Sequence, residues 1–183
     1  MAVTLVAFVF ALFGAPALPG NPGTKAFVTV RPPQLRLAQR RDADVEIRLE
    51  APDGSPVSGV ALEVLARAGN VSVPREVGPG RYAARYTAPE DKFPQADFLV
   101  VRSPRGVLGW KPLPLVGAGK VEVETDPNAL VKLQVAGKNF GPVRADGRGR
   151  AFIKFEAPPG VNTGRLVATD GRRPGSERWI DLG

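Results

Sequence analysis

Alternation of apolar and polar residues, interrupted at short intervals by glycine and proline, is the feature that most restricts the fold of this sequence. Beyond residue 20, no window of eleven or more residues has apolar positions at helical spacing without a glycine or proline in it. Glycine and proline supply 21 and 19 of the 183 residues, yet 43% of the residues are hydrophobic, which is too many for a disordered polymer. The sequence therefore predicts an all-β fold of short strands and tight turns.

Alternation of apolar and polar residues with a period of two predicts where the strands lie and which of their side chains are buried. In Ala43–Leu49 the odd positions are apolar and the even positions are charged, so the odd side chains are expected in a core. Strands with similar patterning are predicted at Lys25–Val30, Val60–Ala66, Gly80–Thr87, Asp97–Arg102, Val107–Leu115, Lys120–Thr125, Leu130–Val135, Arg150–Glu156, Thr163–Thr169 and Glu177–Leu182. The predicted core residues are Val45, Ile47, Leu49, Leu62, Val64, Tyr82, Tyr86, Phe98, Val100, Leu133, Val135, Phe152, Phe155, Leu166 and Val167.

The strands divide into two blocks at Gly117-Ala118-Gly119, which we interpret as a short linker. Residues 24–116 and 117–183 are then expected to form two tandem immunoglobulin-like β-sandwiches, the second of them smaller. At 67 residues the second block is near the size at which a hydrophobic core becomes marginal. It is therefore expected to need the first block as a neighbour.

Several motifs carry a family resemblance. In the first block they are Asp53–Val60 (DGSPVSGV), Gly80–Pro89 (GRYAARYTAP) and Phe98–Val101 (FLVV). These stretches resemble immunoglobulin-like modules of bacterial surface proteins of the invasin and intimin type and, more distantly, filamin repeats. In the second block, Phe140–Val143 and Arg144–Ala151 are similar to the compact β module often placed after such domains. The resemblance implies a stalk, spacer or adhesion unit, and it implies no catalytic residue.

The N-terminus carries an apolar run, Ala2–Phe13, followed by Ala15-Pro16-Ala17. Twelve helical residues reach only about 18 Å, against about 30 Å of bilayer hydrocarbon, and Pro16 would break an extension. We interpret residues 1–19 as a signal peptide cleaved near Ala17, with no membrane span in the mature chain, although no basic residue precedes Lys25. The alternative is an apolar strand at the start of a cytosolic protein.

The absence of histidine and cysteine excludes imidazole catalysis, thiolate nucleophiles, thiolate zinc sites and disulfides. We therefore predict no enzyme activity, no metal and no cofactor. A hydrolase with a carboxylate pair is the remaining enzymatic alternative. Aspartate-glycine pairs are more typical of tight turns than of calcium-binding loops. If calcium is bound, the best candidate ligands are Glu90, Asp91 and Asp97.

The formal net charge of +7 suggests an anionic partner. Fourteen basic residues stand against ten acidic ones in 24–116, and eleven against eight in 117–183, so neither block is a dedicated basic domain. The densest clusters are Arg40-Arg41, Arg144/Arg148/Arg150 and Arg172-Arg173. Solubility and protection of sheet edges would explain such clusters equally well. No aromatic residues interleave them, which disfavours nucleic acid.

Two regions are candidate binding sites. Residues 144–150 are predicted to form an exposed hairpin, with Asp146-Gly147 at its positive-φ positions and Arg144, Arg148 and Arg150 on display. A tryptophan in a strand most often fills a core, but Lys111 and Pro112 mark an edge, so Trp110 is the better candidate than Trp179 for an exposed platform.

These features predict a non-enzymatic, exported structural or adhesion module of a bacterial cell envelope, located in the periplasm, at the outer-membrane surface or outside the cell. Its partner would be an anionic envelope polymer or another surface protein. The alternative function is a module that binds carbohydrate or an envelope polymer through Trp110 and arginines.

Overall fold

A computed structural model describes residues 23–169 and 175–182, and all regular structure in these ranges is β-strand. The prediction of an all-β fold is confirmed. The predicted signal peptide, residues 1–19, and the Arg172-Arg173 cluster lie outside the described residues. The strands are β1 (Lys25–Arg31), β2 (Leu35–Arg36), β3 (Asp42–Glu50), β4 (Glu63–Ala66), β5 (Asn70–Val71), β6 (Arg75–Gly78), β7 (Arg81–Thr87), β8 (Gln95–Ser103), β9 (Gly106–Glu124), β10 (Leu130–Val135), β11 (Lys138–Arg144), β12 (Arg150–Ala157), β13 (Thr163–Thr169) and β14 (Ser176–Asp181).

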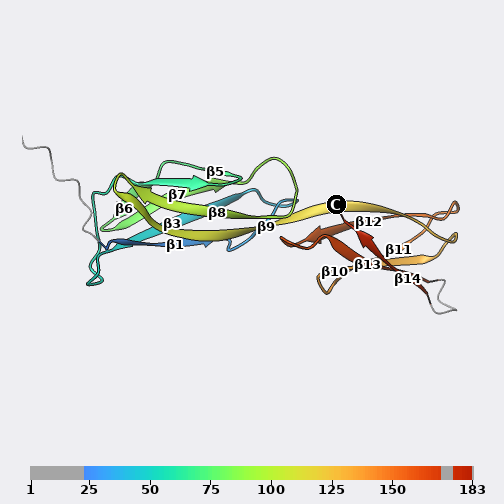
Figure 1. The fold of residues 1–183 in the computed structure, drawn as a ribbon. Coiled ribbons are helices and arrows are strands. Elements are labelled where there is room, and N and C mark those ends of the chain that lie inside the picture. The colour runs from blue at the N-terminus through green and yellow to red at the C-terminus, as the bar shows by residue number, and fades with distance from the viewer. Residues whose placement is uncertain (1–22, 170–174, 183) are drawn as a thin grey trace, which may run out of the picture.

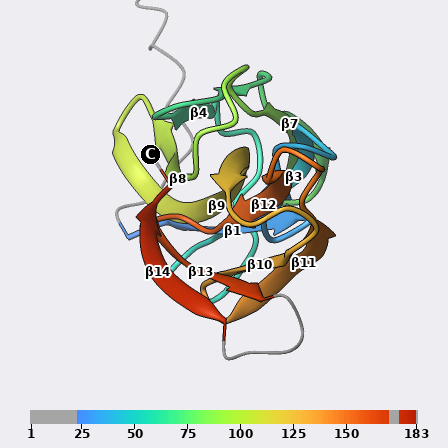
Figure 2. The same ribbon diagram turned by 90° about the vertical axis from the view of Figure 1, so that its right-hand side faces the viewer.

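Three sheets build two lobes that lie end to end (Figure 1). The first outer sheet has the order β1-β3-β7-β5, with β6 also paired to β7, and the last has the order β11-β10-β13-β14. The middle sheet has the order β12-β9-β8-β4, with β2 beside β9. Figure 2 views the second lobe end-on, with β10, β11, β13 and β14 curving below β9 and β12. The middle sheet therefore takes part in both lobes.

Strand β9 is the connection between the lobes. Its first part pairs with β8 through Gly106–Leu115, and its last part pairs with β12 through Gly117–Glu124. Gly117-Ala118-Gly119, the predicted short linker, lie inside this paired strand. A Cβ atom on Gly117 would lie 2.7 Å from the carbonyl oxygen of Lys92, and one on Gly119 would lie 2.6 Å from the Phe155 ring. The glycines permit close packing at this junction.

Each lobe has its own hydrophobic core. The buried residues of the first are Val30, Leu35, Leu37, Ala43, Val45, Ile47, Leu49, Val60, Val64, Tyr82, Tyr86, Ala88, Leu99, Val101, Leu113 and Leu115. Those of the second are Val123, Val131, Leu133, Val135, Ala145, Ala151, Ile153, Phe155, Ala157 and Leu166. Ten of the fifteen predicted core residues are buried, and Leu62, Val100 and Val167 are half-buried.

The predictions for Phe98 and Phe152 are wrong. Phe98 is 38% exposed because the buried face of β8 carries Asp97, Leu99 and Val101. Phe152 is 45% exposed, since Ile153 and Phe155 face inward on β12 and successive residues of a strand point to opposite faces. Both errors are errors of strand parity.

Strand β11 was not predicted, because Gly141-Pro142 interrupts its sequence pattern. The pairing of β10 with β11 shifts register between Val131 and Leu133, opposite this dipeptide. A register shift of this kind allows a proline within a paired strand, where it cannot donate a backbone hydrogen bond.

Asp97 joins the two sheets of the first lobe. Its side chain is 0% exposed and accepts hydrogen bonds from the backbone N–H groups of Arg67, Ala68, Gly69 and Phe98 at 2.8–3.0 Å. It also accepts one from the Tyr86 hydroxyl at 2.7 Å, so a residue of β8 holds both β7 and the loop between β4 and β5. A buried carboxylate is stable only when its oxygens are satisfied in this way.

Burial by itself would raise the pKa of Asp97, but the hydrogen bonds from Tyr86 and from the backbone stabilise the charged form and lower the pKa below its usual value. The folded-state pKa is thus below the unfolded one. The stabilisation by Asp97 is present above the unfolded pKa of about 3.9, and it is lost as the pH falls through the folded pKa.

We predict that Asp97→Asn lowers the free energy of unfolding by about 1–3 kcal/mol at neutral pH, because an amide nitrogen then faces donors that need an acceptor. The loss should shrink as the pH falls from about 4 toward the folded-state pKa, because the unfolded wild-type chain takes up a proton at Asp97 first and the folded protein does so only at lower pH. Urea unfolding at several pH values measures this. Asp44→Asn, on the exposed side of β3, is the control and should leave both stability and pH profile within error. Equal effects of the two substitutions would contradict the role given to Asp97.

Candidate functional site

The structure separates the two predicted candidate sites. Trp110 lies on β9 in the first lobe, whereas Arg150 pairs with Glu124, fourteen positions further along the same strand. At about 3.3 Å per residue, that spacing corresponds to roughly 45 Å. Trp110 and the cluster Arg144/Arg148/Arg150 therefore do not form one site.

Trp110 lies on an exposed apolar face of the middle sheet. Leu65 of β4, Val100 of β8 and Trp110 of β9 are direct cross-strand partners, so their side chains share one face. The Phe98 ring centroid is 6.1 Å from that of Trp110, with the rings tilted by 49°. Trp110 is 63% exposed and Leu65 is 41% exposed. We call this set, Leu65, Phe98, Val100 and Trp110, the Trp110 face.

Sequence reasoning identified only Trp110 of this face. Phe98 and Val100 are predicted core residues, and Asp97, which is buried and fixes the parity of β8, is predicted only as a weak calcium candidate. Trp179 on β14 is also exposed, at 67%, so a tryptophan there does not fill a core either. Trp179 thus offers an exposed tryptophan in the other lobe for comparison.

The arginine segment is a connection between sheets and not a hairpin. Arg144 ends β11, which pairs with β10, and Arg150 begins β12, which pairs with β9. The positive-φ residue is Gly149, at φ +78°, and not Asp146 or Gly147. Asp146 Oδ1 accepts hydrogen bonds from the N–H groups of Arg148 and Arg150 at 2.8 Å each, which closes the loop.

All three predicted arginines are exposed. Arg144 Nη1 donates to the carbonyl oxygen of Asn128 at 3.0 Å, and Arg150 Nε is 3.7 Å from Asp146 Oδ2. Among the described residues, no carboxylate lies within ion-pair distance of the Arg148 side chain. The loop therefore presents positive charge to solvent, although only one of its arginines lacks a protein acceptor.

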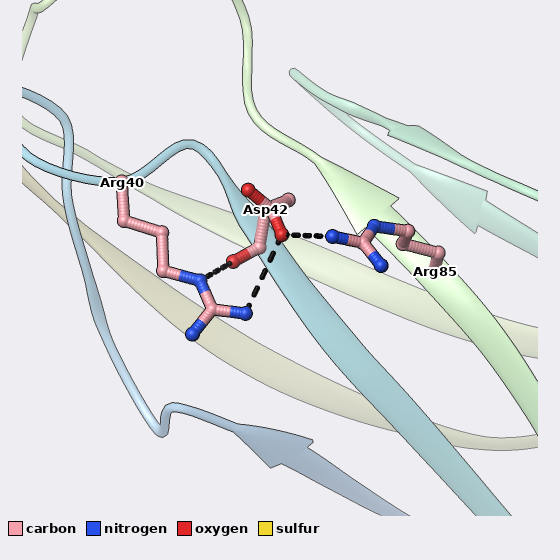
Figure 3. Close-up of polar contacts among 3 residues, drawn as sticks. All are labelled: Arg40, Asp42 and Arg85. Atoms are coloured by element: carbon pink, nitrogen blue, oxygen red, sulfur yellow. Dashed lines mark hydrogen bonds and ion pairs between the residues drawn. The ribbon is translucent and has the colours of Figure 1, made fainter.

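Most other arginines of the strands form surface ion pairs. Asp42 pairs with Arg85 of β7 and, at 3.4 Å, with Arg40, as Figure 3 shows. Glu46 similarly pairs with Arg81 at 2.6 Å and with Arg31 at 3.6 Å. Arg102 pairs with Glu63, and Arg165 with Glu177, at 2.6 Å. Most of these ion pairs link neighbouring strands of the same sheet.

The described residues contain no cluster of three or more acidic side chains that could hold a metal ion. Of the three calcium candidates, Asp97 has both oxygens occupied by protein donors. Asp91 Oδ1 accepts a hydrogen bond from the Phe93 N–H at 3.2 Å. Residues 23–169 and 175–182 contain no helix with the length and apolar character needed to cross a membrane.

No protein-family model matches the sequence, and neither does the sequence of any curated protein. The structure is similar to the adhesin InvE of Yersinia pseudotuberculosis, with 15% identity, a TM-score of 0.43 and coverage of 86% of this chain and 58% of that one. It is also similar to the Escherichia coli adhesin FdeC, with 12% identity, a TM-score of 0.48 and coverage of 86% and 64%. For invasin, described as a bacterial integrin-binding protein, the values are 10% identity, 0.46, and 86% and 40%.

This chain spans less than two thirds of each of those three chains. These similar structures are the adhesins InvE and FdeC and invasin, and the motifs in the sequence resemble modules of proteins of that kind. At these identities and TM-scores the likeness concerns the fold, and no function is carried over from it.

We predict that Gly149→Ala destabilises the second lobe, because Gly149 has a positive φ and an added Cβ would lie 2.0 Å from the carbonyl oxygen of Thr125. The cost should be about 1–3 kcal/mol in urea unfolding. Gly147→Ala is the matched control two residues away, since no heavy atom lies within 4 Å of its Cβ position, and it should be neutral. The hairpin expected from the sequence would give the reverse order.

Proposed function

We propose that this chain is a non-enzymatic, exported contact module of a bacterial envelope that presents the Trp110 face to another surface protein. The observation that carries the proposal is the exposed Trp110 side chain, which lies beside Phe98 on the exposed face of the middle sheet. Large exposed aromatic side chains grouped on one face are typical of interaction sites. The location would be the periplasm, the outer-membrane surface or the extracellular space.

The sheet construction supports a spacer role in the same proposal. Strand β9 enters both lobes without a break, and Glu156 of β12 bonds to Arg36 and Gln39 of the first lobe at 3.7 and 3.2 Å. The Ala118 N–H also donates to the carbonyl oxygen of Lys92 at 3.2 Å. Two lobes joined in this way would hold the Trp110 face at a fixed distance and orientation from the second lobe.

A second candidate function is binding of a carbohydrate or envelope polymer. The exposed indole of Trp110 favours it, since an accessible aromatic ring on a flat sheet offers an apolar platform for a sugar ring. In this alternative the Trp110 face binds a glycan and not a protein. A screen of proteins and glycans therefore distinguishes the two candidate functions.

We predict that the purified protein binds saturably to intact cells of its source organism, and that Trp110→Ser weakens this binding by about tenfold or more. Trp179→Ser, which removes an equally exposed indole from the other lobe, should leave binding unchanged. Both variants should keep the wild-type thermal midpoint to within a few degrees, because both side chains are largely exposed.

Protease treatment of the cells and a glycan array identify the class of partner. Loss of binding after proteolysis supports a surface protein, whereas retention of binding together with array hits lost in Trp110→Ser supports the glycan alternative. Equal behaviour of the Trp110 and Trp179 variants, or no saturable binding at all, would refute the role of the Trp110 face.

Export is tested separately. We predict that the protein isolated from its native cell lacks the N-terminal segment up to about Ala17, because the apolar run and the Ala15-Pro16-Ala17 step match a signal peptide. Intact mass spectrometry of the native protein measures this. A mass that includes Met1 to Ala17 would contradict cleavage and require an uncleaved anchor or a cytosolic location.

A further inference from the structure

A pocket of about 620 Å³ lies where the two lobes meet. Residues of the first lobe, of the middle of β9 and of strands β11 and β12 line it together. Its charged lining residues are Arg36, Lys92, Lys120, Lys138, Lys154 and Glu156. Four of the seven lysines of the chain are thus gathered around one hollow, although they are far apart in the sequence.

Positive charge in this junction pocket exceeds the negative charge available to balance it. Glu156 is the single carboxylate of the lining, and it is already engaged by Arg36 at 3.7 Å and by Lys138 at 3.3 Å. In the part of the chain that the structure describes, Lys92, Lys120 and Lys154 have no carboxylate within ion-pair distance. This contrasts with the strand arginines, most of which are paired.

Two of these lysines are direct cross-strand partners. Lys154 of β12 pairs in register with Lys120 of β9, so both side chains leave the sheet on the same side. Like charges directly opposite each other destabilise an antiparallel pair. The Lys120 ammonium lies 4.6 Å from the centroid of the Phe152 ring, a contact that offsets part of its charge. A bound anion that contacts both lysines would replace the remaining repulsion with attraction.

We propose that the junction pocket binds a segment of an acidic saccharide through two or more of its carboxylate or sulfate groups. The volume lies in the range of ligand sites and exceeds what a single small anion fills. Lysine ammonium groups act as mobile point charges, and they suit anionic groups whose geometry varies along a polymer. The Gln39 amide nitrogen donates to Glu156 Oε1 at 3.2 Å, so the amide oxygen is the part of this lining side chain that is suited to a sugar hydroxyl.

Other polyanions fit the pocket less well. Single-stranded nucleic acid needs exposed aromatic rings for base stacking, but Phe155 is buried and Phe140 has the Lys138 ammonium 5.0 Å from its ring centroid. A lipid surface needs charges on a flat or convex face, whereas these charges line a hollow between two lobes. The site does not depend on the Trp110 face, so either proposal can fail alone.

The test is isothermal titration calorimetry of the purified protein at low ionic strength. The probes are tetragalacturonate for carboxylates, a heparin-derived tetrasaccharide for sulfates, maltotetraose as the neutral saccharide, inorganic phosphate, and phosphatidylglycerol vesicles. At least one acidic tetrasaccharide should bind, and maltotetraose should not. The acidic probe that binds identifies the anionic group.

The decisive variant is Lys120→Gln/Lys154→Gln, which should weaken binding by about tenfold or more through loss of two charge-assisted contacts. Its thermal midpoint should stay within a few degrees of the wild-type value, because removal of the like-charge pair offsets the loss of the Lys120 contact with the Phe152 ring. Lys25→Gln/Lys132→Gln removes the same net charge at exposed positions outside the pocket and should change affinity less than about twofold.

The same titrations with Arg144→Ser/Arg148→Ser/Arg150→Ser test whether binding is instead at the arginine loop, and they should match the wild type. Equal weakening by the two lysine pairs would show attraction to net charge alone and overturn the proposal. Absence of binding by both acidic tetrasaccharides, or binding of phosphate or vesicles only, would overturn it as well.

Discussion

The two lobes share one strand, β9, which is hydrogen-bonded to a different partner at each end. β9 pairs with β8 in the first lobe and with β12 in the second. The second lobe therefore completes its sandwich with the continuation of a strand that begins in the first. The core of the second lobe, with ten buried residues, is therefore covered by a sheet on each side. This matters because the second block is near the lower size limit for independent folding.

The sequence allowed the strands to be predicted where alternation is strict, as in Ala43–Leu49, where every odd residue is buried. The prediction of buried positions from the sequence failed where the buried residue is polar. Asp97 is buried only because four backbone N–H groups and a tyrosine hydroxyl satisfy it, and local pattern contains none of these partners. Gly117 and Gly119 show a related limit. Glycine in a sequence is typical of a linker, but it also occurs in strands where neighbouring groups pack too closely for a Cβ atom.

The charged candidate sites also could not be predicted fully from the sequence, because the pairing of charges depends on the fold. Runs such as Arg144/Arg148/Arg150 are visible in a sequence, but folding pairs many arginines with acidic residues on neighbouring strands. The unpaired lysines of the junction pocket come from segments of the chain that meet only in the folded protein. Exposure of Trp110 was predictable from its edge residues, whereas its grouping with Leu65 and Phe98 required the strand register.

If β9 holds the two lobes in one fixed arrangement, the distance between a label on each lobe should have one narrow distribution. The chain has no cysteine, so Asp44→Cys on β3 and Lys132→Cys on β10 give one spin label on each lobe for double electron–electron resonance. A single narrow distribution is expected, and a flexible glycine-serine insertion between Gly117 and Ala118 should broaden it. A broad or multi-peaked distribution in the chain without the insertion would contradict the claim and return residues 117–119 to the role of a hinge.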